Sequence, residues 1–130
     1  MKGVLRIEPT VRALRILCAE DNAQLGDILV CLLTQRGHDV RHVCNGREAW
    51  DLLAGNVDAF DLVVTDNQMP EIGGADLVGL LRQAGFSGRI VVYCSSLNAL
   101  DRARYKLLRV DRIVEKTAGP KELVAAVEGA

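Results

Sequence analysis

The feature that most constrains the fold of this chain is a fivefold alternation of strand-like and helix-like segments. Short apolar runs alternate with longer runs whose apolar residues recur every three or four positions. The five predicted strands are Arg15–Ala19, Asp39–Val43, Asp61–Thr65, Arg89–Cys94 and Asp111–Val114. Repeated units of this kind favour a parallel sheet with helices packed on both of its faces.

The segments between the predicted strands carry the start and stop signals of helices. Asn22 is the predicted N-cap of the first helix, and Gly37 is its predicted stop. Asn45 and Glu48 have the spacing of a capping box, and Pro120 suits the first turn of the last helix. The first helix also carries an apolar stripe expected to face the core. This stripe consists of Leu25, Ile28, Leu29, Leu32 and Leu33.

The polarity of the predicted strands indicates their order in the sheet. The first, third and fourth strands are apolar on both faces, as central parallel strands must be. The second strand carries Asp39 and Arg41 at alternate positions, which suits an edge. We therefore expect a doubly wound, three-layer α/β/α sheet with strand order 2-1-3-4-5. Its ligand site would lie beyond the carboxyl ends of the first and third strands, where the winding direction switches.

Length and charge narrow the class of protein. A chain of 130 residues is expected to form one domain, here residues 15–130, with residues 1–14 as a tail or linker. A net charge of −1 without a basic face gives no electrostatic support for direct nucleic-acid binding. No run approaches about 20 apolar residues, so no membrane segment is predicted and a cytoplasmic location is expected. None of the four cysteines forms a C-x-x-C pair.

Carboxylates follow both strands that flank the predicted switch point. Glu20 and Asp21 follow the first strand, and Asp66 follows the third. Mg²⁺ prefers oxygen ligands and retains several waters. Asp21 and Asp66 are the expected direct ligands, Glu20 would hold a coordinated water, and the backbone carbonyl of Gln68 would add a neutral ligand. A carboxylate beside such a cation can accept a phosphoryl group, which makes Asp66 the candidate acceptor. The alternative is that these acids only cap the helices that follow.

Lys116 follows the fifth predicted strand at the same edge of the sheet. A lysine there would place positive charge beside the oxygens of a transferred phosphoryl group. Two phosphatase classes fail on their own motifs. A haloacid-dehalogenase-like enzyme needs an aspartate two residues after Asp66, where Gln68 stands, and a cysteine phosphatase needs an arginine closing the loop after Cys94, where none occurs before Arg102. Both enzyme interpretations therefore fail, and Asp66 is left as the candidate acceptor of a phosphoryl group.

Three motifs occur in the order typical of a known family. They are the acidic pair Glu20–Asp21, the loop Asp66-x-x-Met69–Pro70-x-x-x-Gly74 and the lysine Lys116. Over about residues 14–128 the chain resembles the receiver domain of two-component response regulators and hybrid kinases. The resemblance implies a flavodoxin-like (βα)5 fold, a phospho-acceptor at Asp66 and Mg²⁺ bound by Glu20 and Asp21. It implies that a histidine kinase or phosphotransfer protein donates the phosphoryl group, small-molecule donors also being possible.

Three positions depart from the family pattern. Cys94 stands where the family has threonine or serine, unless a one-residue shift brings Ser95 to that place. Ile113 replaces the family's aromatic switch residue, and Thr117 replaces the proline after the lysine. These departures concern switching, not phosphate acceptance. We expect Asp66 to be phosphorylated, with a reduced or differently built change on the face of the fourth helix, fifth strand and fifth helix, where a downstream target would bind. The alternative is a receiver-like interaction module that works without phosphate.

Other polar residues have weaker assignments. Gln68 and Ser96 flank the expected phosphoryl position and are candidates for positioning or excluding water during hydrolysis. Tyr93 and Tyr105 are alternative switch groups, although packing or surface roles are expected for both. The sequence is compatible both with a stand-alone receiver and with a piece of a longer kinase or regulator, and it names neither the cognate kinase nor the output.

Overall fold

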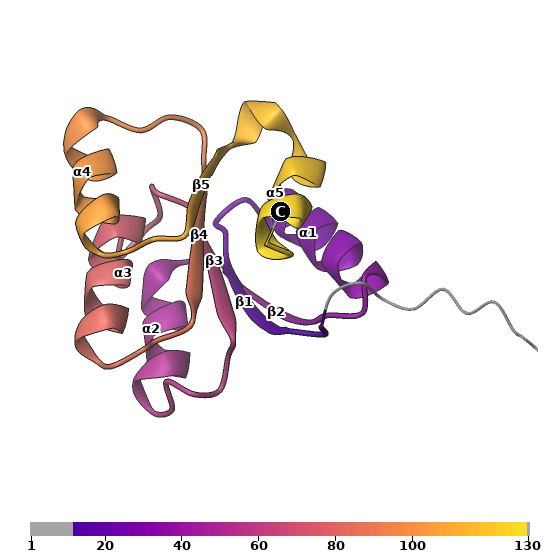
Figure 1. The fold of residues 1–130 in the computed structure, drawn as a ribbon, viewed down its shortest axis with the longest axis horizontal. Helices are drawn as coiled ribbons and strands as arrows, with labels where there is room; N and C mark the ends of the chain where they lie inside the picture. The colour runs from indigo at the N-terminus through magenta and orange to yellow at the C-terminus, as the bar shows by residue number, and fades with distance from the viewer. Residues whose placement is uncertain (1–11, 130) are drawn as a thin grey trace, which may run out of the picture.

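The computed structural model describes residues 12–129, which form a five-stranded parallel sheet between two layers of helices (Figure 1). The strand order is β2-β1-β3-β4-β5, with every neighbouring pair parallel. The strands are β1 (Arg15–Ala19), β2 (Asp39–Val43), β3 (Leu62–Thr65), β4 (Arg89–Cys94) and β5 (Arg112–Glu115). This confirms the doubly wound, flavodoxin-like fold and the edge position of β2. Most of the predicted tail, residues 1–11, lies outside the described part of the chain.

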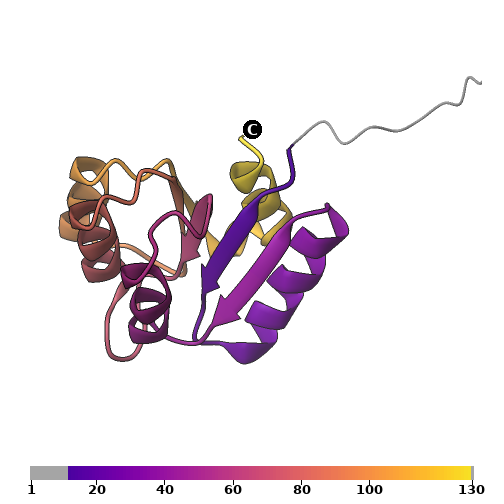
Figure 2. The same ribbon diagram turned by 90° about the horizontal axis from the view of Figure 1, so that it is seen from below.

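The helices cover the sheet in two layers, as Figures 1 and 2 show. One layer consists of α1 (Ala23–Gln35) and α5 (Pro120–Val127), and the other of α2 (Gly46–Ala54), α3 (Gly74–Gln83) and α4 (Ala99–Leu107). A short 3-10 turn, η1 (Lys116–Ala118), joins β5 to α5. Strand side chains alternate between the two layers, so each face of the sheet has its own buried apolar cluster.

Three predicted strand boundaries were wrong by one residue. The fifth strand ends at Glu115 instead of Val114, and two strands begin one residue later than predicted, because an aspartate stands at the entrance of each. Asp61 and Asp111 precede β3 and β5 instead of beginning them. Asp61 Oδ2 accepts a hydrogen bond from the Arg15 backbone N–H at 2.8 Å. Asp111 Oδ2 accepts one from the Ile90 backbone N–H, also at 2.8 Å. Each carboxylate therefore satisfies a backbone donor at the start of the neighbouring strand.

The predicted helix caps are present, with one difference in detail. Asn22 Oδ1 accepts from the Leu25 N–H at 3.0 Å, and Asn45 Oδ1 accepts from the Glu48 N–H at 2.8 Å. In a regular capping box the glutamate also accepts a hydrogen bond from the backbone N–H of the cap residue, here Asn45. Instead, Glu48 Oε1 accepts from the backbone N–H of Cys44 at 3.0 Å. The glutamate of the capping box therefore bonds to the residue before the cap and not to the cap itself.

The apolar stripe of α1 is only partly buried. Leu29 and Leu33 are completely buried, whereas Ile28 is 48% exposed. The prediction that the whole stripe faces the core was therefore wrong for Ile28. Helix α1 packs against the edge strand β2, and within residues 12–129 no further strand lies beyond β2. The apolar face of α1 is wider than the part of the sheet that it covers.

We expect the Asp61→Asn variant to lose stability at neutral pH and to become less sensitive to acid. Arg15 Nη2 lies 2.9 Å from Asp61 Oδ1, and the side-chain and backbone hydrogen bonds from Arg15 lower the pKa of Asp61 to about 2. Because this pKa is below its value of about 3.9 in unfolded chains, the charged carboxylate stabilises the fold above about pH 4. That contribution is lost as the pH falls toward 2. The pair is partly exposed, so we expect a loss of about 1 kcal/mol at pH 7.

Chemical denaturation at a series of pH values between 7 and 2 measures this effect. The free energy of unfolding of Asp61→Asn should change less over that range than that of the unmodified chain. Asp51→Asn is the matched control, because Asp51 pairs with Arg47 on an open helix surface and both side chains are about 60% exposed. We expect less than about 0.5 kcal/mol there. Parallel pH profiles for Asp61→Asn and the unmodified chain would contradict the prediction.

Candidate functional site

Three carboxylates converge at the carboxyl edge of the sheet, as the strand order predicted. Glu20 and Asp21 directly follow β1, and Asp66 directly follows β3, its neighbour in the sheet. One carboxylate oxygen from each residue lies within 4.8 Å of the others. Glu20 and Asp66 are buried, whereas Asp21 is exposed. Three carboxylates at this separation repel one another strongly unless positive charge lies among them.

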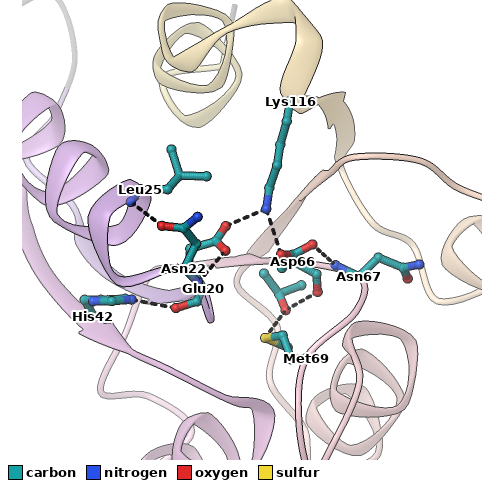
Figure 3. A network of polar contacts seen from close by, with 9 residues as sticks. Glu20, Asn22, Leu25, His42, Asp66, Asn67, Met69 and Lys116 are labelled. Atoms are coloured by element: carbon teal, nitrogen blue, oxygen red, sulfur yellow. Dashed lines mark hydrogen bonds and ion pairs between the residues drawn. The ribbon is translucent and has the colours of Figure 1, made fainter.

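Lys116 supplies part of that positive charge. It stands at the start of η1, directly after β5, and its Nζ lies 2.8 Å from Asp66 Oδ2 and 3.0 Å from Glu20 Oε1 (Figure 3). Burial acts to lower the pKa of Lys116, but the hydrogen bonds to Asp66 and Glu20 outweigh it and raise that pKa. The lysine is therefore held in its charged form. The cluster retains an excess of negative charge, since one lysine faces three acids.

Backbone N–H groups fix the orientation of the two buried carboxylates. The N–H of Asn22 donates to Glu20 Oε2 at 3.0 Å, and the N–H of Asn67 donates to Asp66 Oδ1 at 2.7 Å (Figure 3). His42 Nε2 lies 2.7 Å from the backbone oxygen of Glu20 and holds the end of β1 from the side. Burial raises the pKa of Glu20, and the hydrogen bonds from Asn22 and Lys116 oppose that rise.

An open pocket of about 300 Å³ lies over these groups. Gln68, Ser95 and Ser96 lie around it. The full lining is Asp21, Asn22, Asp66, Asn67, Gln68, Ser95, Ser96 and Lys116. Cys94 does not line the pocket. It ends β4 with a completely buried side chain, and burial raises the pKa of its thiol, which therefore stays protonated.

The donor set of the pocket fits a hard divalent cation. Every charged ligand offered is a carboxylate oxygen, and no thiolate or imidazole belongs to the cluster. Mg²⁺ is bound in proteins by one or two carboxylates with several waters, and the exposed Asp21 leaves room for waters. Asp21 has the most open oxygens, because both oxygens of Glu20 and both oxygens of Asp66 already take part in hydrogen bonds or ion pairs. The residues therefore fit the expected Mg²⁺ site.

The three departures from the family pattern have distinct surroundings. Ile113 is half-buried and packs against the apolar cluster on the α2–α4 side of the sheet. Thr117 lies within η1, and no cis peptide bond occurs within residues 12–129. Tyr93 and Tyr105 are both buried, but they belong to different clusters. Tyr93 lies on the α1 and α5 side, and Tyr105 lies on the α2–α4 side.

Two sets of buried polar contacts were not foreseen from the sequence. Tyr105 donates a hydrogen bond to the side chain of Asn67, the residue directly after Asp66. The only sequence signal for Asn67 is its position beside the candidate acceptor. His38 is buried between two partners: its Nδ1 accepts from the Leu14 N–H at 3.1 Å, and its Nε2 lies 3.0 Å from Glu128 Oε2. No sequence pattern indicates that His38 pairs with Glu128.

The topology and the acid cluster together define a flavodoxin-like α/β domain with its site at the carboxyl edge of β1 and β3. The family model of the response regulator receiver domain matches residues 16–128. The chain therefore belongs to the response regulator receiver family of two-component signal transduction. Members of this family serve as phospho-acceptors and are not enzymes in the usual sense. Within residues 12–129 no helix has the length and apolar character needed to cross a bilayer.

Similar proteins agree with this assignment. A probable transcriptional regulatory protein of Picosynechococcus is 32% identical over 130 residues, which cover 96% of this chain and 51% of that protein. The alkaline phosphatase synthesis transcriptional regulatory protein SphR of Synechococcus elongatus is 33% identical over 87% of this chain and 47% of its own length. The chain thus spans about half the length of these curated relatives. The non-phosphorylated HemR receiver domain of Leptospira biflexa superposes with a TM-score of 0.81 at 29% identity, covering 88% of this chain and 90% of that one.

Proposed function

We propose that this domain accepts a phosphoryl group on Asp66 in a Mg²⁺-dependent reaction. The proposed donor is the phosphohistidine of a histidine kinase or phosphotransfer protein, and small-molecule phosphodonors can serve the same site. The observation that carries the proposal is the ion pair between Lys116 and Asp66 in a polar pocket that Asp21 also lines, with the buried carboxylate of Glu20 paired to the same lysine. Receiver domains interact with histidine kinases; which kinase acts on this one is a separate question.

The side chains divide the chemistry among them. A carboxylate oxygen of Asp66 attacks phosphorus, the new P–O bond forms, and the P–N bond to the donor histidine breaks with its electron pair left on the imidazole. Asp21, Asp66 and the water-holding Glu20 would bind Mg²⁺, which supplies positive charge to the phosphoryl oxygens. Lys116 lies 2.8 Å from Asp66 Oδ2, within reach of an oxygen of the attached group. The Asn67 N–H orients the acceptor carboxylate.

The residues around the pocket have proposed supporting roles. The backbone carbonyl of Gln68 would complete the Mg²⁺ ligands, and the side chains of Gln68 and Ser96 would control access of water to the acyl phosphate. Two groups compete for the family's hydroxyl position, the Cys94 thiol and the Ser95 hydroxyl. Ser95 lines the pocket, whereas Cys94 is buried in the core and does not line it. This favours Ser95 as the hydrogen-bond donor to the phosphoryl group, with Cys94 filling space in the core.

Intact mass measured after incubation with Mg²⁺ and acetyl phosphate tests the proposal. We expect a gain of one phosphoryl group, no gain when the metal is chelated, and no gain in Asp66→Asn. That variant keeps the shape of the side chain but removes its nucleophilic charge. Asp51→Asn is a matched control on an exposed helix surface and should be phosphorylated normally. A phosphoryl group that persists in Asp66→Asn would show that the acceptor is elsewhere.

The second candidate is a receiver-like module that binds its partner without phosphate. Ile113 and Thr117 favour it, because neither residue matches the family's switch positions. In the same experiment this candidate predicts no mass gain and no Mg²⁺ binding. A cytoplasmic location and a downstream target on the face formed by α4, β5 and α5 belong to both candidates.

A further inference from the structure

We propose that Tyr105 and Asn67 form a side-chain link that positions the phosphorylation loop and carries its state to α4. This inference rests on the proposed function of Asp66, and it assigns to Tyr105 a role as a positioning residue. The link would take the place of the family's switch pair, whose positions are occupied here by Cys94 and Ile113. It uses an aromatic hydroxyl from α4 itself.

The side-chain amide of Asn67 is held by two residues of α4. Its Oδ1 accepts a hydrogen bond from the Tyr105 hydroxyl, and its Nδ2 donates to Asp101 Oδ2 at 3.3 Å. Its backbone N–H donates to Asp66 Oδ1 at 2.7 Å. Figure 3 shows the Asn67 side chain pointing away from Asp66 and Lys116. One residue therefore contacts the acceptor through its backbone and α4 through its side chain.

Because Tyr105 is buried, loss of its hydrogen bond would be energetically costly. The side chain is completely buried, so a hydroxyl without a partner would lose its hydration with no compensation. Burial, followed by the charge of Asp101, raises the pKa of Tyr105 well above its usual value. The hydroxyl therefore remains a donor at physiological pH. Asn67 is itself 9% exposed, so its Oδ1 has few alternatives to this donor.

The backbone around the link is closely packed. Gly74, the first residue of α3, faces the backbone oxygen of Asp66 and the Cα of Asn67. A Cβ atom added at Gly74 would lie 2.6 Å from the Tyr105 hydroxyl oxygen. The loop after Asp66, the start of α3 and the tyrosine of α4 are therefore in close contact. A shift of the Asp66–Asn67 peptide must displace the tyrosine or break its hydrogen bond, since packed interiors do not deform freely.

Phosphorylation would act on this arrangement directly. Phosphorylating one oxygen of Asp66 forms an acyl phosphate, which removes the carboxylate charge beside the Asn67 N–H and adds a dianionic group to the same pocket. The hydrogen bond between that N–H and Asp66 must then weaken or re-form with a new acceptor. Because the Asn67 amide is tied to Tyr105 and Asp101, the rearrangement reaches α4 through a single residue. Ile113 has no polar atom in its side chain with which to carry such a signal.

Amide NMR spectra of the Tyr105→Phe variant, recorded with Mg²⁺ and with or without beryllofluoride, test the link. Phenylalanine keeps the ring and removes only the hydroxyl. We expect Asp66 still to accept a phosphoryl group from acetyl phosphate, and the amides of Ser95 and Ser96 still to respond to beryllofluoride. The shift changes along α4, at Asp101 and Arg104, should fall by more than about half relative to the unmodified chain. A purely structural tyrosine would lower stability without separating these two responses.

Tyr93→Phe is the matched control, because it is the same change at a buried tyrosine on the other side of the sheet. It should retain the α4 response. Asn67→Ala removes the other half of the link and keeps the backbone N–H, so it serves if Tyr105→Phe folds poorly. The double variant should lose no more of the α4 response than either single variant. An undiminished α4 response in Tyr105→Phe or Asn67→Ala overturns the link. If the unmodified chain neither gains mass nor responds to beryllofluoride, the proposed function fails and the link with it.

Discussion

Replacing Lys116 with alanine is expected to slow phosphorylation of Asp66 by about a hundredfold or more, the usual effect of removing a preorganised charge from a transition state. Lys116 Nζ contacts both Asp66 and Glu20, and it is the cation of the described pocket lining. Without it, only Mg²⁺ would neutralise the negative charge that develops on the phosphoryl oxygens. The rate of mass gain with acetyl phosphate at saturating Mg²⁺ measures the effect.

The same variant should bind Mg²⁺ more tightly, because the lysine competes with the metal for the carboxylates. Opposite effects on metal affinity and on phosphorylation rate would separate an electrostatic role from general damage to the fold. Lys121→Ala is the matched control, since it removes the same charge from an exposed position in the first turn of α5. It should leave both quantities unchanged. A Lys116→Ala rate within about threefold of the unmodified chain would exclude the role assigned to this lysine.

Replacing Gly74 with alanine is expected to lower the free energy of unfolding by about 3 kcal/mol, as overpacking against backbone atoms does. The added methyl group would overlap the backbone oxygen of Asp66 and press on Asn67 and Tyr105. Backbone atoms cannot rotate away as a flexible side chain can. A domain of this size has a total stability of about 5–15 kcal/mol, so the loss is a large fraction of it. Urea denaturation followed by circular dichroism measures the change.

Gly79→Ala supplies the control on the same helix. A Cβ at Gly79 would meet no atom within 4 Å, and glycine inside a helix is less stable than alanine by about 0.5–1 kcal/mol. This variant should therefore be slightly more stable than the unmodified chain. The two substitutions are chemically identical and should have opposite signs. Equal effects at both positions would mean that the close contacts around Gly74 do not limit stability.

The elements and the sheet order followed from local patterns. Strand polarity distinguished the central strands from the edge strand β2, and the cap at Asn22 marked the start of α1 correctly. The clustering of Glu20, Asp21 and Asp66 followed in turn, because parallel neighbours deliver their carboxyl ends to one edge. The boundaries of the strands were predicted less accurately. Asp61 and Asp111 were assigned to strands, although their side chains bond to the backbone of neighbouring strands.

The contacts between polar residues that are distant in the sequence could not be predicted from it. His38 and Glu128 are 90 positions apart, and Asn67 and Tyr105 are 38 apart. Pairing of this kind depends on how far a helix slides along the sheet and on which side chains share the remaining space. Neither the position of a helix along the sheet nor the choice of neighbouring side chains can be predicted from the periodicity of the sequence. The exposure of Ile28 has the same origin, since it depends on the width of the sheet beneath α1.

The sequence by itself determined the doubly wound sheet, the acid cluster and the family. The sheet depends on the periodicity of apolar residues, and the acid cluster depends on which residues follow the strands. Both are local properties of the sequence, and the parallel topology brings the strand ends together. Only the tertiary structure decided that Lys116 is paired with both Asp66 and Glu20, that Cys94 is buried in the core while Ser95 lines the pocket, and that α4 holds the residue after Asp66. The physical reason is that a hydrogen bond requires its two atoms within about 3 Å. Placement that accurate comes from the packing of the whole domain.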